Sequence, residues 1–251
     1  PMKFADEFFK SVSDAKNIVI TSHTSPDDDS VGSVLAIYWT IKNKYPKKNV
    51  EAIYTGEREN RYKKFKGYDK IKFVPDLADN MNGVDLLIML DGGGFGRFSD
   101  QPEKLRKFAG KTICIDHHSS PPDGFDLFML CPQLLSSCQI IYESFYKTAD
   151  IPKPIAEALL LGLLGDTGNF SYLGPSDLGA FDMGKRLIDI LQIQIQEFVA
   201  RYSLISPRIF KLISELIVNT KLEKIEGWDG YSWTYLNREL AERESHSDNE
   251  I

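Results

Sequence analysis

The sequence predicts an α/β fold: a doubly wound, mainly parallel sheet with flanking helices, followed by a linker helix and a partial second domain. Two observations predict the sheet. In the first half of the chain, short β-branched or apolar runs alternate with segments of helical spacing. Two of these runs, Asp85–Asp91 and Lys111–Asp116, are strongly apolar, which is typical of parallel strands buried on both faces.

The expected elements follow one another in chain order. The strands of the sheet are predicted at Asn17–Ser22, Val50–Thr55, Lys70–Val74, Asp85–Asp91 and Lys111–Asp116. Helical spacing between them predicts helices at Val31–Lys44 and Pro102–Ala109. The second half is mainly helical, with helices expected at Leu134–Ala149, Pro154–Leu164, Ser176–Leu191 and Ile193–Tyr202.

A change of pattern near Pro207 predicts a domain boundary. Ser206 is expected to be the N-cap and Pro207 the first residue of a helix that runs to about Lys221. Two short strands, Leu222–Ile225 and Tyr231–Leu236, are expected after it. We therefore expect a catalytic domain over residues 2–206, a linker helix over 207–221 and the start of an incomplete substrate-binding domain over 222–251. Pro1 before Met2 is interpreted as the remnant of a cleaved tag.

Composition limits the classes of partner. The chain has 251 residues with a net charge of -6, whereas proteins that bind long duplexes usually carry a basic excess. Its apolar runs are too short to cross a bilayer, so no membrane partner is expected. The three cysteines include no C-x-x-C pair, which favours reduced thiols and a cytoplasmic location. Oligomeric state is left open, with a homodimer among the alternatives.

Histidines and aspartates cluster after the predicted strands. His23, His117 and His118 each follow an apolar run, and the carboxyl ends of parallel strands form the ligand-binding edge of such a sheet. Carboxylates stand beside them: Asp27, Asp29, Asp91, Asp116 and, at the end of the apolar segment Ala156–Gly165, Asp166. Each histidine alone is more often an ordinary loop residue. Together, these groups would repel and desolvate one another without a counter-charge.

Divalent cations would supply that counter-charge. Mixed imidazole and carboxylate ligands suit manganese, iron or zinc, and the number of aspartates favours manganese or magnesium. A single ion cannot accept so many ligands and keep an open position, so two ions are expected.

Two loops carry further detail. Asp27 and Asp29 can point at neighbouring ions, Asp28 is expected at the surface or behind the ligands, and Ser30 is expected to cap the following helix. Gly32 would allow a backbone or a substrate to approach closely. After Asp91, three glycines indicate a backbone that passes close to a metal, and Arg97 could clamp a phosphate.

Four motifs in order resemble those of the DHH phosphoesterases. They are SHTSPDDDS, the strand that ends in Asp91, Asp116-His117-His118 and GLLGDTGNF, and they span residues 17–175. The resemblance is greatest to the subgroup of nanoRNases and 3'-phosphoadenosine-5'-phosphate phosphatases, which have a RecJ-like N-terminal domain. Members of that subgroup also carry a C-terminal GGGH motif that grips the substrate. This chain has none, so we expect either a fragment or a protein without the usual clamp.

The resemblance implies a role for each site residue. His23, Asp27 and Asp91 would hold one manganese ion, and Asp91 would bridge to a second ion held by Asp29, His117 and Asp166. His118, with Arg97 as a weaker candidate, would contact the scissile phosphate. Asp116 would orient a histidine.

The expected activity is hydrolysis of short single-stranded oligonucleotides, linear dinucleotides or 3'-phosphoadenosine 5'-phosphate. The nucleophile would be a hydroxide that bridges two manganese ions about 3.5–4 Å apart. The alternatives are a cyclic-dinucleotide phosphodiesterase, a manganese pyrophosphatase and a non-catalytic nucleotide-binding module. Pyrophosphatases of this kind carry an Asp-His-Asn run where this chain has Asp91-Gly92-Gly93, which makes that alternative the weaker one.

Overall fold

A computed structural model describes residues 2–119, 123–203, 207–225 and 227–235. The chain forms two compact units, residues 1–201 and residues 202–251. The domain limits expected from the sequence, 2–206, 207–221 and 222–251, stay predictions.

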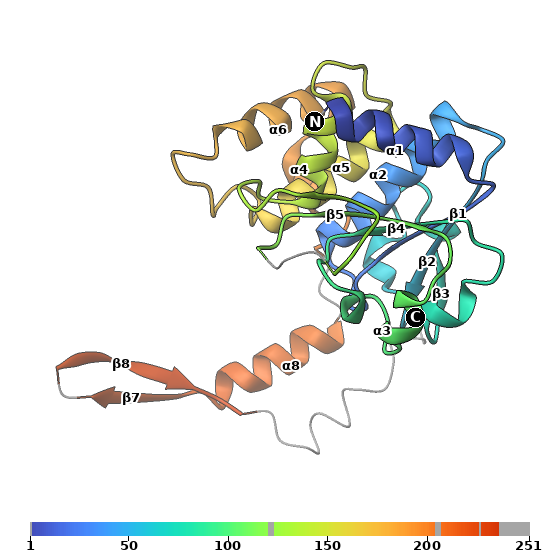
Figure 1. Ribbon diagram of the computed structural model, residues 1–251. Helices are drawn as coiled ribbons and strands as arrows, with labels where there is room; N and C mark the ends of the chain where they lie inside the picture. The colour runs from blue at the N-terminus through green and yellow to red at the C-terminus, as the bar shows by residue number, and fades with distance from the viewer. Residues whose placement is uncertain (1, 120–122, 204–206, 226, 236–251) are drawn as a thin grey trace. The chain divides into compact units, whose positions relative to one another are not determined.

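Unit 1 is built on a six-stranded sheet whose strands are all parallel (Figure 1). The strand order is β3-β2-β1-β4-β5-β6. The strands are β1 (Asn17–Ser22), β2 (Asn49–Thr55), β3 (Lys72–Val74), β4 (Leu86–Leu90), β5 (Lys111–Asp116) and β6 (Leu127–Leu130). The chain winds outward in both directions from the neighbouring pair β1 and β4. The predicted α/β fold with a doubly wound parallel sheet is confirmed.

Helices cover the sheet on both faces. Figure 1 shows α1 (Met2–Asp14), α2 (Asp28–Lys44), α4 (Ser137–Ile141) and α5 (Lys153–Asp166) on one side and α3 (Pro102–Arg106) on the other. On the side of α3, alternate strand residues pack against short 3-10 turns at Leu77–Asn80 and Phe95–Arg97. The remaining elements of unit 1 are the 3-10 turns Asn60–Tyr62 and Tyr68–Lys70, a π-helical turn at Tyr142–Tyr146, and the helices α6 (Leu178–Leu191) and α7 (Ile195–Val199).

Helices α2 and α5 pack closely because glycines face the contact. A Cβ on Gly32 would lie 2.6 Å from the carbonyl oxygen of Ala158, and one on Gly162 would lie 2.3 Å from Asp29 Oδ1. Neither distance is sterically possible. The close approach expected at Gly32 is therefore made by the backbone of α5, and the glycines of the GLLGD segment bring α5 against the start of α2.

The structure corrects several expected elements. Helix α1 and strand β6 were not predicted, and β3 begins at Lys72 rather than Lys70. The helix expected from Val31 begins at Asp28, because Asp27 rather than Ser30 is the N-cap: Asp27 Oδ1 accepts the Ser30 amide at 2.9 Å. Ser30 Oγ in turn accepts the Asp27 amide, which completes a capping box. The single helix expected over Leu134–Ala149 is instead the short α4 followed by the π-helical turn.

Unit 2 contains the helix α8 (Pro207–Val218) and an antiparallel pair, β7 (Lys221–Ile225) and β8 (Trp228–Trp233). The helix ends three residues before the expected end near Lys221. The second strand begins at Trp228 rather than Tyr231, because Trp228 already pairs with Ile225. Two expected positions, the N-cap Ser206 and the strand end Leu236, lie outside the described residues.

Candidate metal centre

The site lies where the chain reverses its winding direction. His23 comes directly after β1, Asp91 directly after β4, and His117 directly after β5, and β1 and β4 are neighbours in the sheet. The loops after β1 and β4 leave the sheet in opposite directions, which opens a crevice at the carboxyl edge. A cavity of about 170 Å³ lies there, lined by Asp27, Asp91, His117, His118, Leu135 and Asp166.

Asp91 is the centre of the arrangement. Its side chain is only 3% exposed. One oxygen, Oδ2, lies 3.4 Å from His23 Nε2, and the other, Oδ1, lies 3.4 Å from His117 Nε2. The Asp91 carboxylate thus lies between the two histidines, with one oxygen directed at each of them.

The backbone of Asp91 is left-handed, with a φ of 57°. This conformation is uncommon for a residue with a side chain, and it costs on the order of 1–3 kcal/mol unless the surroundings hold it. The amide of Asp91 is fixed by the carbonyl oxygen of Ile115 in β5 at 2.9 Å. The strained turn aims the carboxylate into the crevice instead of continuing the strand.

A first group of potential ligands consists of His23, Asp27 and Asp91, whose ligand atoms lie within 4.8 Å of one another. His23 Nε2 is 3.3 Å from Asp27 Oδ2. The other Asp27 oxygen caps α2, so the cap holds the free oxygen toward the histidine. The buried Nε2 atom makes no hydrogen bond with either carboxylate, although both lie close to it.

A second group consists of Asp29, His117 and Asp166. His117 Nε2 lies 3.2 Å from Asp166 Oδ2. Asp166 is the last residue of α5, and Asp29 lies in the first turn of α2. The close packing of these two helices therefore brings both carboxylates to the histidine that follows β5.

Asp29 is fully buried and is held by the start of α4. Its Oδ2 accepts the Ser137 amide at 2.6 Å, and its Oδ1 accepts the Cys138 amide at 3.0 Å. Ser137 also donates from Oγ to Asp91 Oδ1 at 3.3 Å. Ser137 was missed by the sequence analysis. Its only signal is the Ser136-Ser137 pair before an apolar helix, which indicates a cap and not a site.

The charges at the centre shift one another's pKa values. Burial lowers the pKa of His23, but the carboxylates of Asp27 and Asp91 close to its Nε2 outweigh that effect and raise the pKa to about 9. The pKa of His117 is likewise raised to about 9 by Asp91 and its neighbours, against the effect of burial. Burial and the neighbouring carboxylates raise the pKa of Asp29 to about 7 and that of Asp166 to about 9. The carboxylates at the centre therefore repel one another, and a bound cation would relieve this repulsion.

His118 and Asp116 lie beside this centre. His118 Nδ1 donates to Asp116 Oδ1 at 2.7 Å and lies 3.7 Å from Asp91 Oδ1. The second oxygen of Asp116, Oδ2, is buried and has no hydrogen-bond partner. His118 is 44% exposed, so its ring reaches the cavity surface while Asp116 anchors it from below.

Arg97 and Asp28, two residues that the sequence analysis considered for the site, do not line the cavity. Arg97 is exposed and does not line the cavity, although its carbonyl oxygen accepts the Thr24 amide next to His23. Asp28 is not a solvated surface group: its Oδ1 accepts the Tyr62 hydroxyl at 2.7 Å and lies 3.1 Å from Arg61. Asp28 thus ties the N-terminus of α2 to a neighbouring turn.

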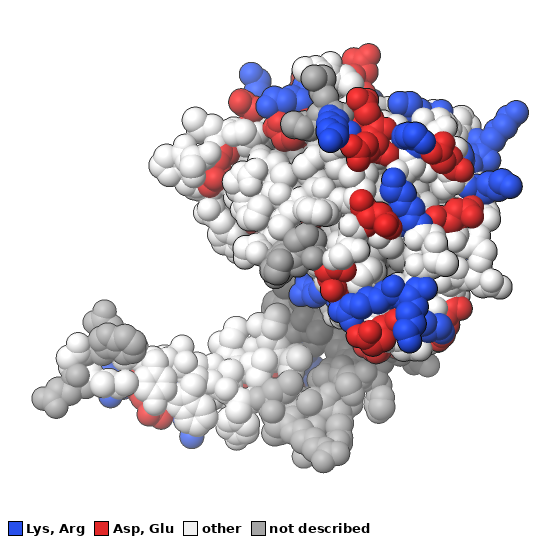
Figure 2. Space-filling view, in the orientation of Figure 1, with Lys and Arg blue, Asp and Glu red and all other residues white. Residues whose placement is uncertain are grey.

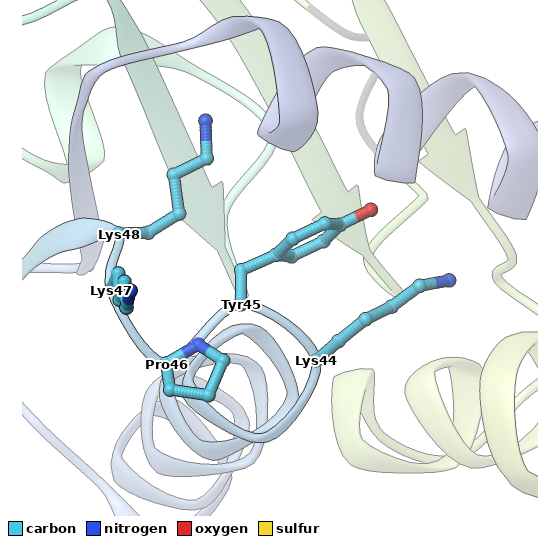
Figure 3. Close-up of a pocket in the computed structure, with 5 residues that line it drawn as sticks. All are labelled: Lys44, Tyr45, Pro46, Lys47 and Lys48. Atoms are coloured by element: carbon cyan, nitrogen blue, oxygen red, sulfur yellow. The ribbon is translucent and has the colours of Figure 1, made fainter.

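A larger cavity, of about 450 Å³, is remote from this centre. Figure 3 shows its lining, which is Lys44, Tyr45, Pro46, Lys47 and Lys48 at the end of α2. The 17 residues of α2 separate it from Asp28 by about 25 Å. The larger cavity therefore shares no residue with the candidate metal site, which lies at the smaller cavity.

The donor set fits divalent metal ions. Nitrogen and carboxylate oxygen atoms lie 3.2–3.4 Å apart. Ligands bound at roughly 2.0–2.2 Å to one ion have about this separation. The unpartnered Nε2 of His23 agrees with a position turned toward an ion rather than toward a hydrogen-bond acceptor. Imidazole and carboxylate together suit manganese, iron or zinc.

Fold and site define a class of protein: a doubly wound α/β protein with a cluster of histidines and aspartates at its topological switch point. Residues 17–163 match the DHH family, N-terminal domain. The chain belongs to the DHH family, and the resemblance found in its four motifs is confirmed.

Relatives with known names support the same grouping. The chain is 26% identical over 173 residues to the bifunctional oligoribonuclease and PAP phosphatase NrnA of Bacillus subtilis, covering 66% of this chain and 51% of that protein. It is 27% identical over 189 residues to a probable manganese-dependent inorganic pyrophosphatase of Lactococcus lactis, covering 72% of this chain and 58% of that protein. This chain spans about half the length of the curated relatives it matches.

A solved structure shares the fold. An exopolyphosphatase-related protein from Bacteroides fragilis superposes with a TM-score of 0.83 at 22% identity, covering 98% of this chain and 73% of that one. Among the residues that the structure describes, the helices are all too short or too polar to cross a membrane.

Proposed function

We propose that this protein is a metal-dependent phosphoesterase that hydrolyses short oligonucleotides, linear dinucleotides or 3'-phosphoadenosine 5'-phosphate. The observation that carries the proposal is the position of Asp91, whose two oxygens face His23 and His117 at 3.4 Å each. A single buried carboxylate between two ligand groups is the arrangement that two bridged ions require.

The proposed ligands divide between two ions. His23, Asp27 and Asp91 would hold one ion, and Asp29, Asp91, His117 and Asp166 the other. When bound, two divalent ions would neutralise the carboxylates, lower the pKa of an attacking water and polarise the phosphoryl group. Manganese is the proposed metal. It is supported by the mixed nitrogen and oxygen donors and by the names of two relatives that are probable manganese-dependent pyrophosphatases.

The protein's own groups have separate tasks in this proposal. The Asp116 carboxylate keeps the proton of His118 on Nδ1, which leaves Nε2 to meet a phosphate oxygen or to accept a proton. His118 would position the phosphate and stabilise the charge that develops on it. Leu135 forms an apolar side of the cavity, which restricts water next to the reacting group.

The substrate class is proposed from the relatives. Several are named as oligoribonuclease and PAP phosphatase, and their similarity extends over 62–86% of this chain. Inorganic pyrophosphate is a second candidate, because similarity to probable pyrophosphatases reaches 27% over 189 residues. The Asp91-Gly92-Gly93 run, in place of Asp-His-Asn, makes it the weaker one.

The test is a screen of manganese-dependent hydrolysis. Substrates would be pApA, a trinucleotide, 3'-phosphoadenosine 5'-phosphate, a cyclic dinucleotide and pyrophosphate. We expect mononucleotide release from the short linear substrates and little phosphate from pyrophosphate. Efficient hydrolysis of pyrophosphate alone would replace the proposed function with the second candidate. Binding of nucleotides without turnover in manganese would favour a non-catalytic module.

A further inference from the structure

Two exposed apolar side chains, called here the apolar shelf, follow the proposed metal ligand Asp166 along the chain and lie outside the residues that line the cavity. They are Tyr172, 78% exposed, and Leu178, 64% exposed, in and after the segment that joins α5 to α6. Large exposed apolar side chains that gather next to a site usually have a ligand to cover them. Neither residue takes part in the proposed metal binding or proton transfer.

The tyrosine ring is placed by the turn that follows Asp166. Gly168 lies two residues after this proposed ligand, and the ring of Tyr172 lies directly over it: a Cβ on Gly168 would be 2.4 Å from Tyr172 Cε2. The Tyr172 amide is held by the carbonyl oxygen of Thr167 at 3.1 Å. One side of the ring therefore rests on a glycine beside the metal centre, while most of the ring faces solvent.

The turn under the ring is held firmly. Gly168, Asn169 and Phe170 are all left-handed, with φ values of 55°, 56° and 68°. For a bulky residue such as Phe170 this conformation persists only when its surroundings enforce it. They do so here, because Phe170 stacks on Phe181 at 5.4 Å between ring centres and fills the space left by Gly184.

Leu178 is connected to the cavity through its neighbour in the chain, Gly179. The adjacent Gly179 lies against Gln139, whose side-chain amide nitrogen is 3.7 Å from a Cβ placed on that glycine. Gln139 Oε1 accepts the amide of Leu135 at 2.9 Å, and Leu135 lines the metal cavity. Leu178 is thus linked to the apolar side of the cavity through Gly179 and Gln139.

The chemistry of the shelf suits a nucleobase better than a phosphate. Figure 2 shows that the surface around the segment between α5 and α6, at the left of the view, is mostly uncharged. Aromatic side chains bind bases through their faces and tolerate any base, because every base has a π-face. In a nucleotide whose phosphate lies at the metal centre, the base is only one sugar away, and Tyr172 lies over a glycine two residues from the proposed ligand Asp166.

We propose that Tyr172, with Leu178 as a second apolar contact, is the stacking platform for the nucleobase of the nucleotide whose phosphate occupies the metal centre. The inference rests on the proposed function for the phosphate position. It adds a reason why such a site would favour nucleotides over phosphate esters that have no base.

The test compares two ligands that differ only in the base. Adenosine 5'-monophosphate and ribose 5-phosphate are titrated by calorimetry into the manganese-loaded wild-type protein, Tyr172→Ala, Tyr172→Phe and the control Phe128→Ala, which removes another half-exposed aromatic ring. Wild type should bind the nucleotide roughly tenfold more tightly, the scale of one stacked base. Tyr172→Ala should lose this preference while its affinity for ribose 5-phosphate is unchanged. Tyr172→Phe and Phe128→Ala should keep it.

Three results would overturn the platform. They are equal binding of the two ligands by wild type, an equal loss of both ligands in Tyr172→Ala, and a loss of preference in Tyr172→Phe, which would indicate a hydroxyl contact instead of stacking.

Parallel assays with pApA separate this inference from the proposed function. A preference that depends on Tyr172, without hydrolysis of pApA or of the other proposed substrates, would sustain the platform and refute the function. Hydrolysis of pApA without any preference would do the reverse.

Discussion

Asp116 Oδ1 accepts a hydrogen bond from His118 Nδ1 at 2.7 Å, and the two side chains differ sharply in exposure. The carboxylate is 1% exposed and the imidazole 44% exposed. A buried anion thus sets the tautomer and the direction of a ring at the cavity surface. The adjacent His117 points elsewhere, toward Asp91 and Asp166. The two consecutive histidines therefore share Asp91 but differ in their second carboxylate, Asp116 for His118 and Asp166 for His117, and they are expected to have different functions.

We predict that His118→Ala lowers turnover strongly while metal content stays nearly intact. His117→Ala should lose metal, because its Nε2 is the atom between Asp91 and Asp166. Asp116→Asn should lower turnover about 10–100-fold, as loss of an orienting partner usually does. Metal content by elemental analysis and turnover of pApA would be measured on all three proteins.

The double variant Asp116→Asn with His118→Ala provides the control. If Asp116 acts through His118, its substitution should have little further effect once His118 is gone. Additive losses would show that Asp116 acts elsewhere, and equal metal loss in the two histidine variants would refute the division of roles.

A second prediction concerns the shared carboxylate. Asp91→Asn keeps the size of the side chain and tolerates the left-handed backbone, so it tests charge separately from fold. We expect wild type to bind about two manganese ions per chain and Asp91→Asn to bind fewer than one, with activity lost more completely than in any other single ligand variant. Asp27→Asn is the matched comparison, since Asp27 contacts only the first group. Near-normal activity of Asp91→Asn in manganese would exclude a bridge at this residue.

Much of this site could be predicted from the sequence because several of its residues directly follow strands of the parallel sheet. In a parallel sheet, residues that directly follow the strands meet at one edge. His23, Asp91 and His117 each follow an apolar run without a gap, so no knowledge of long-range contacts was needed to bring them together. Strands β1 and β5 have the predicted limits, since each has three consecutive apolar residues between polar ends.

The features that were missed depend on tertiary contacts. Ser137 meets Asp29 across 108 residues of chain, and no local pattern marks such a pair. The role of Gly32 as a contact for α5 likewise becomes visible only when the helices are packed. Strand β6 is a half-exposed edge strand of four residues, so it lacks the continuous apolar run of a central strand. Helix α1 could have been found, because its buried residues Phe4, Phe8 and Val12 recur every fourth position.

A third prediction tests the helix contact that supports Asp29. Gly162→Ala would place a methyl group 2.3 Å from Asp29 Oδ1 and 2.4 Å from Cys138 Sγ. Because both neighbours are buried, we expect a loss of about 1–3 kcal/mol in the free energy of unfolding, as is usual for overpacking. Displacement of Asp29 should also weaken manganese binding. Urea unfolding with and without manganese would measure both effects.

Gly179→Ala is the matched control for that substitution. Gly179 also lies in a helix, but the nearest atom to an added Cβ is 3.7 Å away, which is an ordinary contact. Its replacement should stabilise the protein slightly or leave it unchanged, because alanine favours the helix over glycine. If Gly162→Ala were as harmless as Gly179→Ala, α5 would not need its glycines to approach the site.

The last prediction concerns pH and the metal-free protein. His23 and His117 have pKa values raised to about 9, so the stability they add is complete below pH 6.5 and is lost as pH rises through 9. The raised pKa values of Asp29, about 7, and Asp166, about 9, act in the same direction: ionisation of these buried carboxylates destabilises the fold as pH rises. The lowered pKa of Asp91 matters only in acid, below about pH 4, where unpaired aspartates titrate.

The melting temperature of the metal-free protein should therefore fall between about pH 6 and pH 9, and excess manganese should reverse the fall. Metal binding requires deprotonated ligands, so the stabilisation by manganese should grow over the same range. The net charge also becomes more negative as pH rises, which by itself can lower stability. Asp166→Asn separates this effect of net charge from the effect of the titrating groups at the metal centre. That variant keeps the overall trend but should show a shallower fall and a smaller gain from manganese. A metal-free melting temperature that is constant or rises toward pH 9 would contradict the strain inferred at the centre, because four of its groups would then titrate without cost to the fold.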